Sequence, residues 1–221
     1  HMHLRVLSES GLSAADEMLY PDNFPYLEDV LSYVAVGARS SENQQHRLVA
    51  SGIDVPVGIK NPMFGSLAVM LNSIYAAQIA NEFKYNDHQV KTTGNPFAHA
   101  VLRGSVDVYG NNIPNYHYED IIKLYDMYGK EGLKNPAVII DTNHSNSNKN
   151  PFEQVRIVKE ILANLRVCDK ANMLVKGFLT ESYIEDGNQS PDGEVYGKSI
   201  TDGCLGWART ERLLLDTAAA L

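Results

Sequence analysis

Three side chains suited to holding a divalent metal occur where this sequence leaves or crosses an expected buried strand. They are one imidazole and two carboxylates: His144, Glu181 and Asp202. This mixture of nitrogen and oxygen ligands suits a hard or borderline cation such as Mn²⁺, Fe²⁺, Co²⁺ or Zn²⁺. Each residue alone has an ordinary explanation, because a histidine after a strand is usually a satisfied core or surface residue and an aspartate there usually caps a turn. Their recurrence in the last units of the chain predicts a metal site.

Three cations lie upstream, each at the end of an apolar run: Arg39, Lys60 and Arg103. Arginine makes bidentate contacts with phosphate or carboxylate, and lysine supplies a mobile point charge. The alternative is that all three are ordinary strand-terminal charges in surface salt bridges. Beside a metal site, three such cations predict a phosphorylated, anionic substrate.

The composition limits the class of protein. The 221 residues, 44% of them hydrophobic, can bury one sizeable core, so we expect one α/β domain over residues 1–221. The formal net charge of −8 makes nucleic acid and anionic membranes poor partners. No apolar run approaches the roughly 18 residues of a membrane span. Cys168 and Cys204 form no C-x-x-C pair, so we expect a reduced, cytoplasmic protein.

Short apolar runs alternate with amphipathic segments along the chain. We expect strands at 33–38, 55–60, 98–103, 137–142 and 174–181, and helices at 26–31, 42–51, 66–82, 118–129, 151–166 and 210–220, the last with Thr210 as its N-cap. Strands alternating with helices predict parallel βαβ units, and in a (β/α) barrel the functional residues lie where the strands end. A Rossmann sheet is disfavoured because no G-x-G-x-x-G follows an early strand. The polar segments 84–95 and 183–198 are expected to be active-site loops.

Short motifs with specific residues and spacing recur along almost the whole chain. They are AVGARS at 35–40, QQHR at 44–47, ASG at 50–52, PVGIKN at 56–61, LRG at 102–104, PNY at 114–116, IDTNHSNS at 140–147, ES at 181–182 and YGKSITD at 196–202. In these motifs and in their order, the chain resembles, over essentially its whole length, the type I 3-deoxy-D-arabino-heptulosonate 7-phosphate (DAHP) synthases, the first enzymes of the shikimate pathway.

The resemblance implies a (β/α)8 barrel and a metal-dependent transferase that condenses phosphoenolpyruvate with erythrose 4-phosphate, for aromatic amino acid biosynthesis. The family holds its metal with Cys, His, Glu and Asp. By resemblance, three of these ligands correspond to His144, Glu181 and Asp202 of this chain.

The substrate contacts are implied in the same way. Arg39, Lys60 and Arg103 match the cations that bind phosphoenolpyruvate, with the backbone at Ala38 beside them. Glu17 matches a family acid near the phosphoenolpyruvate carbon that water attacks. Lys60 is a second catalytic candidate, for proton transfer.

The sequence also departs from the family. The family's first strand carries Gly-Pro-Cys-Ser, whose cysteine is the fourth metal ligand, and its second strand ends in Lys-Pro-Arg-Thr, which contacts erythrose 4-phosphate. Neither motif occurs here. We therefore expect a barrel of about six βα units with the first two missing, and little or no synthase activity from this chain alone. If Met2 is the native start, a shortened gene product is favoured over an artificial truncation.

The missing strands have two further consequences. A barrel without adjacent strands has open edges, so we expect a homo-oligomer, a domain swap or another element to cover them. Cys204 lies two residues after Asp202 and could partly replace the missing thiolate, although a small core thiol is the commoner role for such a residue.

Three functions stay open at this stage. The first is the aldol-type condensation of phosphoenolpyruvate. The second is a catalytically inactive paralogue that binds phosphoenolpyruvate or an aromatic metabolite in regulation or assembly. The third is a fragment with residual metal binding.

Overall fold

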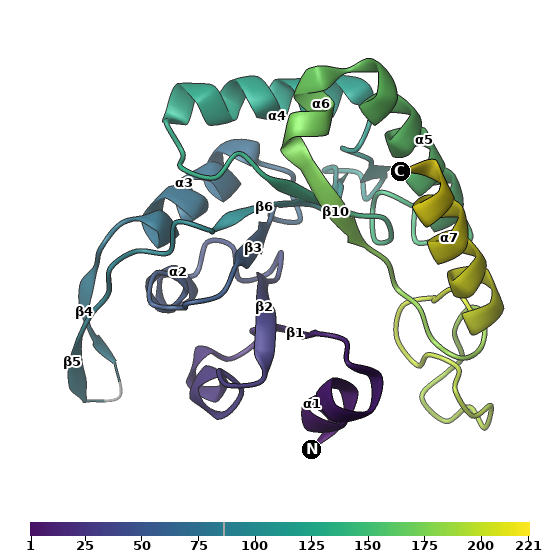
Figure 1. Cartoon of the computed structure of the whole chain (residues 1–221), viewed down its shortest axis with the longest axis horizontal. Coiled ribbons are helices and arrows are strands. Elements are labelled where there is room, and N and C mark those ends of the chain that lie inside the picture. Colours follow the sequence, from purple (N-terminus) through teal and green to yellow (C-terminus); the bar gives the residue numbers. More distant parts are fainter. Residues whose placement is uncertain (86) are drawn as a thin grey trace. The chain divides into compact units, whose positions relative to one another are not determined.

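The computed structural model describes residues 1–85 and 87–221 (Figure 1). The chain forms two compact units. Unit 1 comprises residues 1–101 and 127–137, and unit 2 comprises residues 102–126 and 138–221. The expectation of a single domain over 1–221 stays a prediction.

Unit 1 is built on a parallel sheet. Its strands follow the order β1 (Ala14–Glu17), β2 (Leu31–Val36), β3 (Val57–Lys60) and β6 (His99–Leu102), and only the last residue of β6 belongs to unit 2. Three of these strands were expected from apolar runs, as is typical of parallel strands buried on both faces. Their side chains form the centre of the core, where Val34, Val57, Ile59 and Val101 are almost completely buried.

Two helices of unit 1 confirm the sequence pattern with slightly different bounds. They are α2 (Gln44–Ala50) and α3 (Leu67–Gln78). Side chains at both N-caps accept hydrogen bonds from backbone N–H groups, as Asn43 does from His46 N and Ser66 from Val69 N. One apolar face of α3 is buried, with Met70, Leu71, Ile74 and Ala77 all inaccessible to solvent or nearly so.

The helix expected at residues 26–31 is wrong. A 3-10 helix, η2, runs over Pro21–Tyr26, and β2 already begins at Leu31. Residues 27–30 form a turn in which Val30 N donates to Leu27 O at 3.0 Å, so too few residues remain before β2 for an α-helix. The chain also begins with α1 (Met2–Arg5) and a π-helical turn (Val6–Ser10), neither of which was expected.

The segment 84–95, expected to be an active-site loop, contains strand residues. An antiparallel hairpin pairs β4 (Glu82–Tyr85) with β5 (His88–Lys91). The polar composition concealed a weak alternation in which Phe83, Tyr85 and Val90 are partly buried. Residue 86, inside the expected loop, lies outside the described residues.

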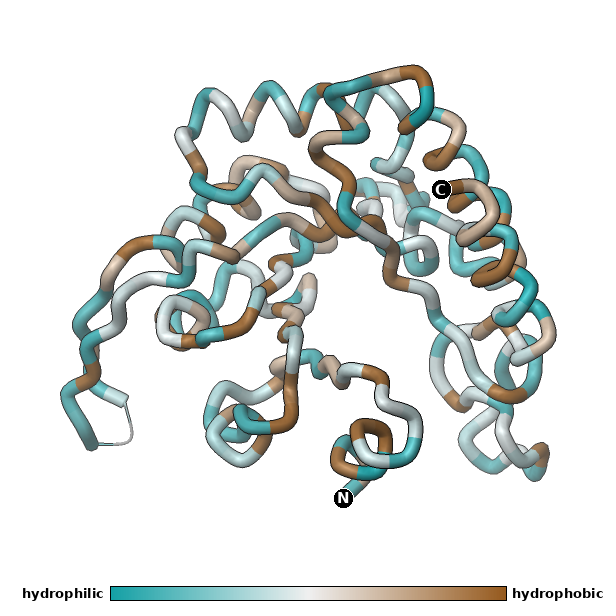
Figure 2. Tube along the Cα trace, viewed as in Figure 1, coloured by the Kyte–Doolittle hydropathy of each residue, from teal (hydrophilic) through white to brown (hydrophobic). Residues whose placement is uncertain are grey.

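Unit 2 contains two further parallel strands, β9 (Val138–Asp141) and β10 (Val175–Leu179), and a small hairpin of β7 (Ser105–Val106) and β8 (Asn112–Ile113). Figure 2 shows hydrophobic segments toward both ends of β10, with a hydrophilic segment between them. The helices that accompany these strands are α5 (Glu153–Val167), α6 (Asp169–Leu174) and α7 (Trp207–Ala220). An apolar cluster joins α5 to α7 through Val158, Leu162, Leu205 and Leu213.

Helix α7 begins earlier than the sequence indicated. Gly206 is its N-cap, and Thr210 lies inside its first turn, where its hydroxyl donates to the Gly206 carbonyl at 3.1 Å. The expected N-cap role of Thr210 is therefore wrong. A threonine can satisfy its hydroxyl on the preceding turn as well as at a cap, and the sequence alone does not separate the two.

The remaining helix, α4 (Tyr118–Glu131), follows the hairpin of β7 and β8. Six parallel strands alternating with helices confirm the α/β class and the βαβ pattern. Within residues 1–85 and 87–221, every helix is too short or too polar to cross a lipid bilayer.

Candidate metal centre

Unit 2 brings together the three side chains that the sequence proposed as ligands. One ligand atom from each of His144, Glu181 and Asp202 lies within 4.8 Å of the other two. The Nε2 of His144 is 3.3 Å from Glu181 Oε1 and 3.9 Å from Asp202 Oδ2. All three residues are partly exposed, so an ion has access from solvent.

The strand ends determine where these side chains lie. Strand β9 ends at Asp141, three residues before His144, and β10 ends two residues before Glu181. Because β9 and β10 are parallel neighbours, both residues leave the same edge of the sheet. His144 adopts a left-handed φ of 48°, which is unusual for a residue other than glycine and common at functional sites.

The backbone of Glu181 is fixed by Gln154, a fully buried residue of α5. Gln154 Oε1 accepts from Glu181 N at 2.9 Å, and Gln154 Nε2 donates to Glu181 O at 3.0 Å. Leu205 N donates to the same carbonyl at 2.9 Å. Although Glu181 lies outside regular secondary structure, its backbone N–H and carbonyl are both hydrogen-bonded, as they are in a strand.

Asp202 belongs to a segment whose backbone is anchored by hydrogen bonds to residues 187 and 188. Gly187 and Cys204 exchange hydrogen bonds of 2.8 and 3.1 Å, and Asn188 Nδ2 donates to Thr201 O at 2.9 Å. The stretch 183–198, expected to be an active-site loop, thus helps to support one proposed ligand.

The electrostatics of the group fit a divalent cation. Burial raises the pKa of the Glu181 carboxyl, whereas His144 and a hydrogen bond from Asn143 lower it. An imidazole nitrogen and two carboxylate oxygens, converging with one carboxyl partly desolvated, form a donor set that a divalent ion would satisfy. Water would complete the coordination.

Cys204 is not a member of this group. Its Sγ is absent from the set of described ligand atoms within 4.8 Å of one another, and it contacts the Asp202 carbonyl at 3.6 Å. Burial raises the pKa of the thiol, which opposes formation of the thiolate that binds metals. The structure favours a small, half-buried thiol over a replacement ligand.

The two proposed catalytic residues are neighbours in unit 1. Lys60 Nζ, at the end of β3, lies 3.7 Å from Glu17 Oε2, at the end of β1. Gly37 makes room for this acid, because a Cβ at that position would collide with the Glu17 carboxylate. Glu17 also lines a cavity of about 280 Å³ beside η2.

The other proposed substrate contacts divide between the units. Ala38 and Arg39 follow β2 in unit 1, where the Arg39 side chain is exposed. Arg103 lies in unit 2, is 6% exposed, and donates from Nη1 to Ser145 Oγ at 3.4 Å. Ser145 directly follows His144, so this cation contacts the loop that carries the proposed imidazole ligand.

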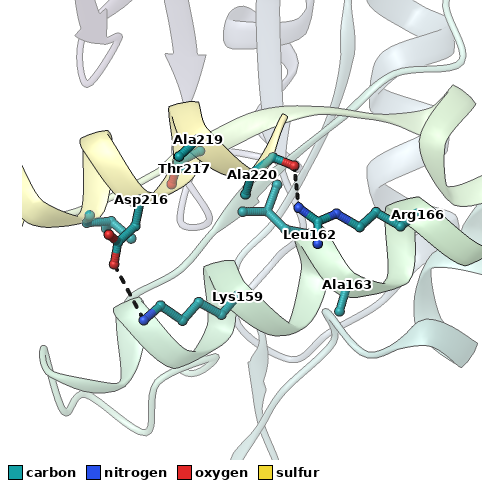
Figure 3. Close-up of a pocket in the computed structure, with 9 residues that line it drawn as sticks. Lys159, Leu162, Ala163, Arg166, Asp216, Thr217, Ala219 and Ala220 are labelled. Atoms are coloured by element: carbon teal, nitrogen blue, oxygen red, sulfur yellow. Dashed lines mark hydrogen bonds and ion pairs between the residues drawn. The ribbon is translucent and has the colours of Figure 1, made fainter.

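A separate cavity in unit 2 lies away from this group. It has a volume of about 390 Å³ and is found between α5 and α7 (Figure 3). Lys159 pairs with Asp216 at 3.6 Å, and Arg166 donates to Ala220 O at 2.6 Å. None of the sequence-predicted site residues lines it.

The comparisons with known proteins agree with the motifs. The profile of the DAHP synthetase I family matches residues 1–215. The Tyr-sensitive phospho-2-dehydro-3-deoxyheptonate aldolase of Salmonella typhimurium is 36% identical over 217 residues, which are 94% of this chain and 58% of the relative. The Phe-sensitive aldolase of Escherichia coli K12 is 38% identical over 224 residues, covering 97% of this chain and 61% of the relative.

A solved structure shows the same fold. Phospho-2-dehydro-3-deoxyheptonate aldolase from Francisella tularensis superposes with a TM-score of 0.86 at 28% identity, over 97% of this chain and 62% of that chain. This match confirms the expected fold class, an incomplete barrel of the TIM type. The chain spans about 60% of the length of these relatives. On the profile match and the identity to these aldolases, it belongs to the DAHP synthetase I family.

Proposed function

We propose that this chain binds a divalent metal and phosphoenolpyruvate and, alone or after assembly, carries out a DAHP synthase-type condensation with erythrose 4-phosphate, the first step of the shikimate pathway. The proposal is supported by family membership and by the names of its relatives. The observation that carries it is the convergence of His144, Glu181 and Asp202.

In this proposal the metal is held by His144 Nε2 and the carboxylates of Glu181 and Asp202. When bound, a divalent ion supplies a Lewis acid that polarises the aldehyde carbonyl of the acceptor sugar phosphate. The protein's part is to present an imidazole nitrogen and two carboxylate oxygens at the same point.

The chain's other residues handle phosphoenolpyruvate. Arg39, Lys60 and Arg103, with the backbone at Ala38, bind its phosphate and carboxylate and offset the negative charge that develops during reaction. Glu17 orients the water and takes its proton. Lys60, 3.7 Å from Glu17, is placed to exchange a proton with it.

The proposed condensation forms and breaks a small number of bonds. C3 of phosphoenolpyruvate forms a carbon–carbon bond to the aldehyde carbon, whose oxygen takes up a proton. Water adds to C2, and the bond from C2 to the phosphate oxygen breaks as inorganic phosphate leaves. No oxidant or reductant is required.

A second function is favoured by one specific observation. Neither Gly-Pro-Cys-Ser nor Lys-Pro-Arg-Thr occurs among its 221 residues. A member that binds phosphoenolpyruvate and metal without turnover, in regulation or assembly, would need neither motif.

Consumption of phosphoenolpyruvate with erythrose 4-phosphate and Mn²⁺, measured beside phosphoenolpyruvate calorimetry, separates these functions. Turnover that is lost in Glu181→Gln and kept in Glu185→Gln, an exposed acid four residues away, supports the condensation. Binding without turnover supports the second function. If phosphoenolpyruvate neither binds nor reacts, both are wrong.

A further inference from the structure

Two buried residues, the last residue of β9 and one in the loop that follows it, contact the proposed ligands. Asp141 is 2% exposed and Asn143 is 1% exposed, which is unusual for polar side chains. Neither lies in the group of three ligand atoms. Burying such groups is costly unless their hydrogen bonds are made, so their contacts indicate what they do.

Asp141 faces the far side of the His144 ring. Its Oδ2 lies 2.8 Å from His144 Nδ1, at ion-pair distance but without the alignment of a hydrogen bond. Its Oδ1 accepts from Asn143 N at 3.1 Å, which fixes the carboxylate in place. With Nδ1 facing Asp141, His144 Nε2 faces Glu181 and Asp202. A carboxylate behind a ligating imidazole fixes the ring and its tautomer.

Asn143 acts on the other side of the group. Its Nδ2 donates to Glu181 Oε2 at 2.8 Å and to the Gly203 carbonyl at 3.1 Å. Its Oδ1 accepts from Ser147 Oγ at 2.8 Å. The amide therefore uses both donor hydrogens and its oxygen. It orients the Glu181 carboxylate and anchors the residue that follows Asp202.

We propose that Asp141 and Asn143 are positioning residues that hold His144 and Glu181 in the metal-binding arrangement. This inference rests on the proposed metal site. Asp141 sets the direction of the imidazole. Asn143 binds Oε2 of Glu181, so that Oε1 of the same carboxylate faces the imidazole. Because both come from one strand end, a shift of β9 would disturb both ligands together.

The test measures metal affinity rather than activity. The 221-residue chain is titrated with Co²⁺ by calorimetry and by visible absorption, which reports coordination geometry. Asp141→Ala is expected to weaken binding about 10- to 100-fold, as is typical when outer-shell partners are removed. Asp141→Asn keeps an acceptor opposite Nδ1, so it should recover part of the affinity. Asn143→Leu, of similar volume but without donors, should weaken binding and change the Co²⁺ spectrum.

Asn146→Leu is the matched control for Asn143→Leu. Asn146 lies in the same loop and is 4% exposed, but among residues 1–85 and 87–221 its amide bonds backbone groups, those of Leu102, Asp141 and Asn115. Circular dichroism and thermal melting show which variants fold. Folded Asn146→Leu should keep the wild-type affinity and spectrum.

The outcomes are distinct. If the wild-type chain does not bind Co²⁺, the proposed metal site itself is wrong. If the wild type binds and the Asp141 and Asn143 variants bind equally well, the site stands and the positioning role is overturned. Equal losses in Asn143→Leu and Asn146→Leu would also overturn it, because they would indicate general damage to the loop. If Asp141→Ala does not fold, Asp141→Asn carries the test alone.

Discussion

Lys149 Nζ lies 4.0 Å from Asp202 Oδ1, while Asp202 Oδ2 lies 3.9 Å from His144 Nε2. One carboxylate thus faces an ammonium on one side and an imidazole on the other. Lys149 reaches this position through a left-handed φ of 60° and a hydrogen bond of 2.8 Å from its N–H to the His144 carbonyl. If Asp202 binds a divalent cation as proposed, this lysine competes with the cation for the same carboxylate.

Replacing Lys149 with glutamine should tighten metal binding. An exposed ion pair at this separation is worth up to about 1 kcal/mol, so we expect a gain of about two- to fivefold. The gain should shrink as ionic strength rises from about 0.05 to 0.3 M, because salt screens exposed charges. Calorimetric titration with Mn²⁺ at both ionic strengths measures the effect.

Lys159→Gln is the matched control. This lysine is equally exposed and also pairs with an aspartate, Asp216, but on the helices α5 and α7. It should leave the Mn²⁺ affinity unchanged. Weaker binding in Lys149→Gln would contradict the prediction and would show that the lysine holds Asp202 in place.

A second prediction concerns phosphoenolpyruvate and Lys60. Lys60 lies at the end of β3, and its side chain is 10% exposed and faces Glu17. A charge-assisted contact is worth about 1.5–3 kcal/mol, so Lys60→Met should weaken phosphoenolpyruvate binding about ten- to hundredfold. Calorimetry without metal and without the acceptor isolates this contact from turnover.

The control for Lys60→Met is Lys91→Met. Lys91 is an exposed cation on the hairpin strand β5, where it pairs with Glu82 at 3.3 Å. Its loss should not change phosphoenolpyruvate affinity. If Lys60→Met folds, as judged by its melting temperature, and binds as tightly as the wild type, then Lys60 is not a phosphoenolpyruvate contact.

The strands show how much of the fold could be predicted from sequence. β2, β3, β6, β9 and β10 are apolar runs, and all five were expected. β1 (Ala14–Glu17) was not, because two small and two acidic residues form no apolar run. It lies at one end of the sheet order and is only partly buried, so its fold does not require a run of apolar side chains there.

Some residues of the candidate site could be predicted from the sequence, and others could not. His144, Glu181 and Asp202 were identified by residue type and by their positions near strand ends. Asp141 and Asn143 lie in the same motif but were not singled out, because their roles depend on the left-handed turn at His144 and on hydrogen bonds made across the loop. Side-chain direction after a strand is not fixed by the strand's periodicity, so no pattern in the sequence indicated it.

We also expect the chain to self-associate. Among the described residues, β1 pairs with β2 alone, so its other edge presents unpaired backbone groups. The helical segment before it buries none of its residues, and nearby apolar side chains are exposed, including Met2, Leu4, Leu12 and Leu19. Light scattering should give a mass above that of one chain.

Leu4→Glu combined with Leu12→Glu should lower that mass, because charge beside an unpaired edge opposes association. Leu215→Glu, an equally exposed leucine on α7, serves as the control and should leave the mass unchanged. A wild-type chain that is monodisperse at the mass of one copy would contradict the prediction.

The last prediction concerns His99, which is 4% exposed at the start of β6. His99 Nδ1 lies 2.8 Å from the Phe97 carbonyl, and Nε2 lies 2.9 Å from Tyr33 Oη. A carbonyl can only accept, so Nδ1 carries the hydrogen and Nε2 accepts from the tyrosine hydroxyl. The neutral ring is fully satisfied, and a second proton would leave Nε2 facing a hydroxyl instead of a negative charge.

Burial lowers the pKa of His99, although the bond to the Phe97 carbonyl acts in the opposite direction. The unfolded chain, with a histidine pKa of about 6.5, therefore takes up the proton first as the pH falls. The stabilisation is fully present above about pH 6.5 and is lost as the pH falls toward the lower folded pKa, with a slope of at most about 1.4 kcal/mol per pH unit.

Urea unfolding at about pH 7.5 and 5.5 measures this loss. His99→Gln removes the titrating group while keeping a donor and an acceptor, so the variant should lose less stability than the wild type between the two values. His88→Gln, at an exposed position on β5, should behave as the wild type does. If His99→Gln and the wild type lose equal free energy of unfolding between the two pH values, His99 does not take up a proton on unfolding, and acid sensitivity must come from other groups.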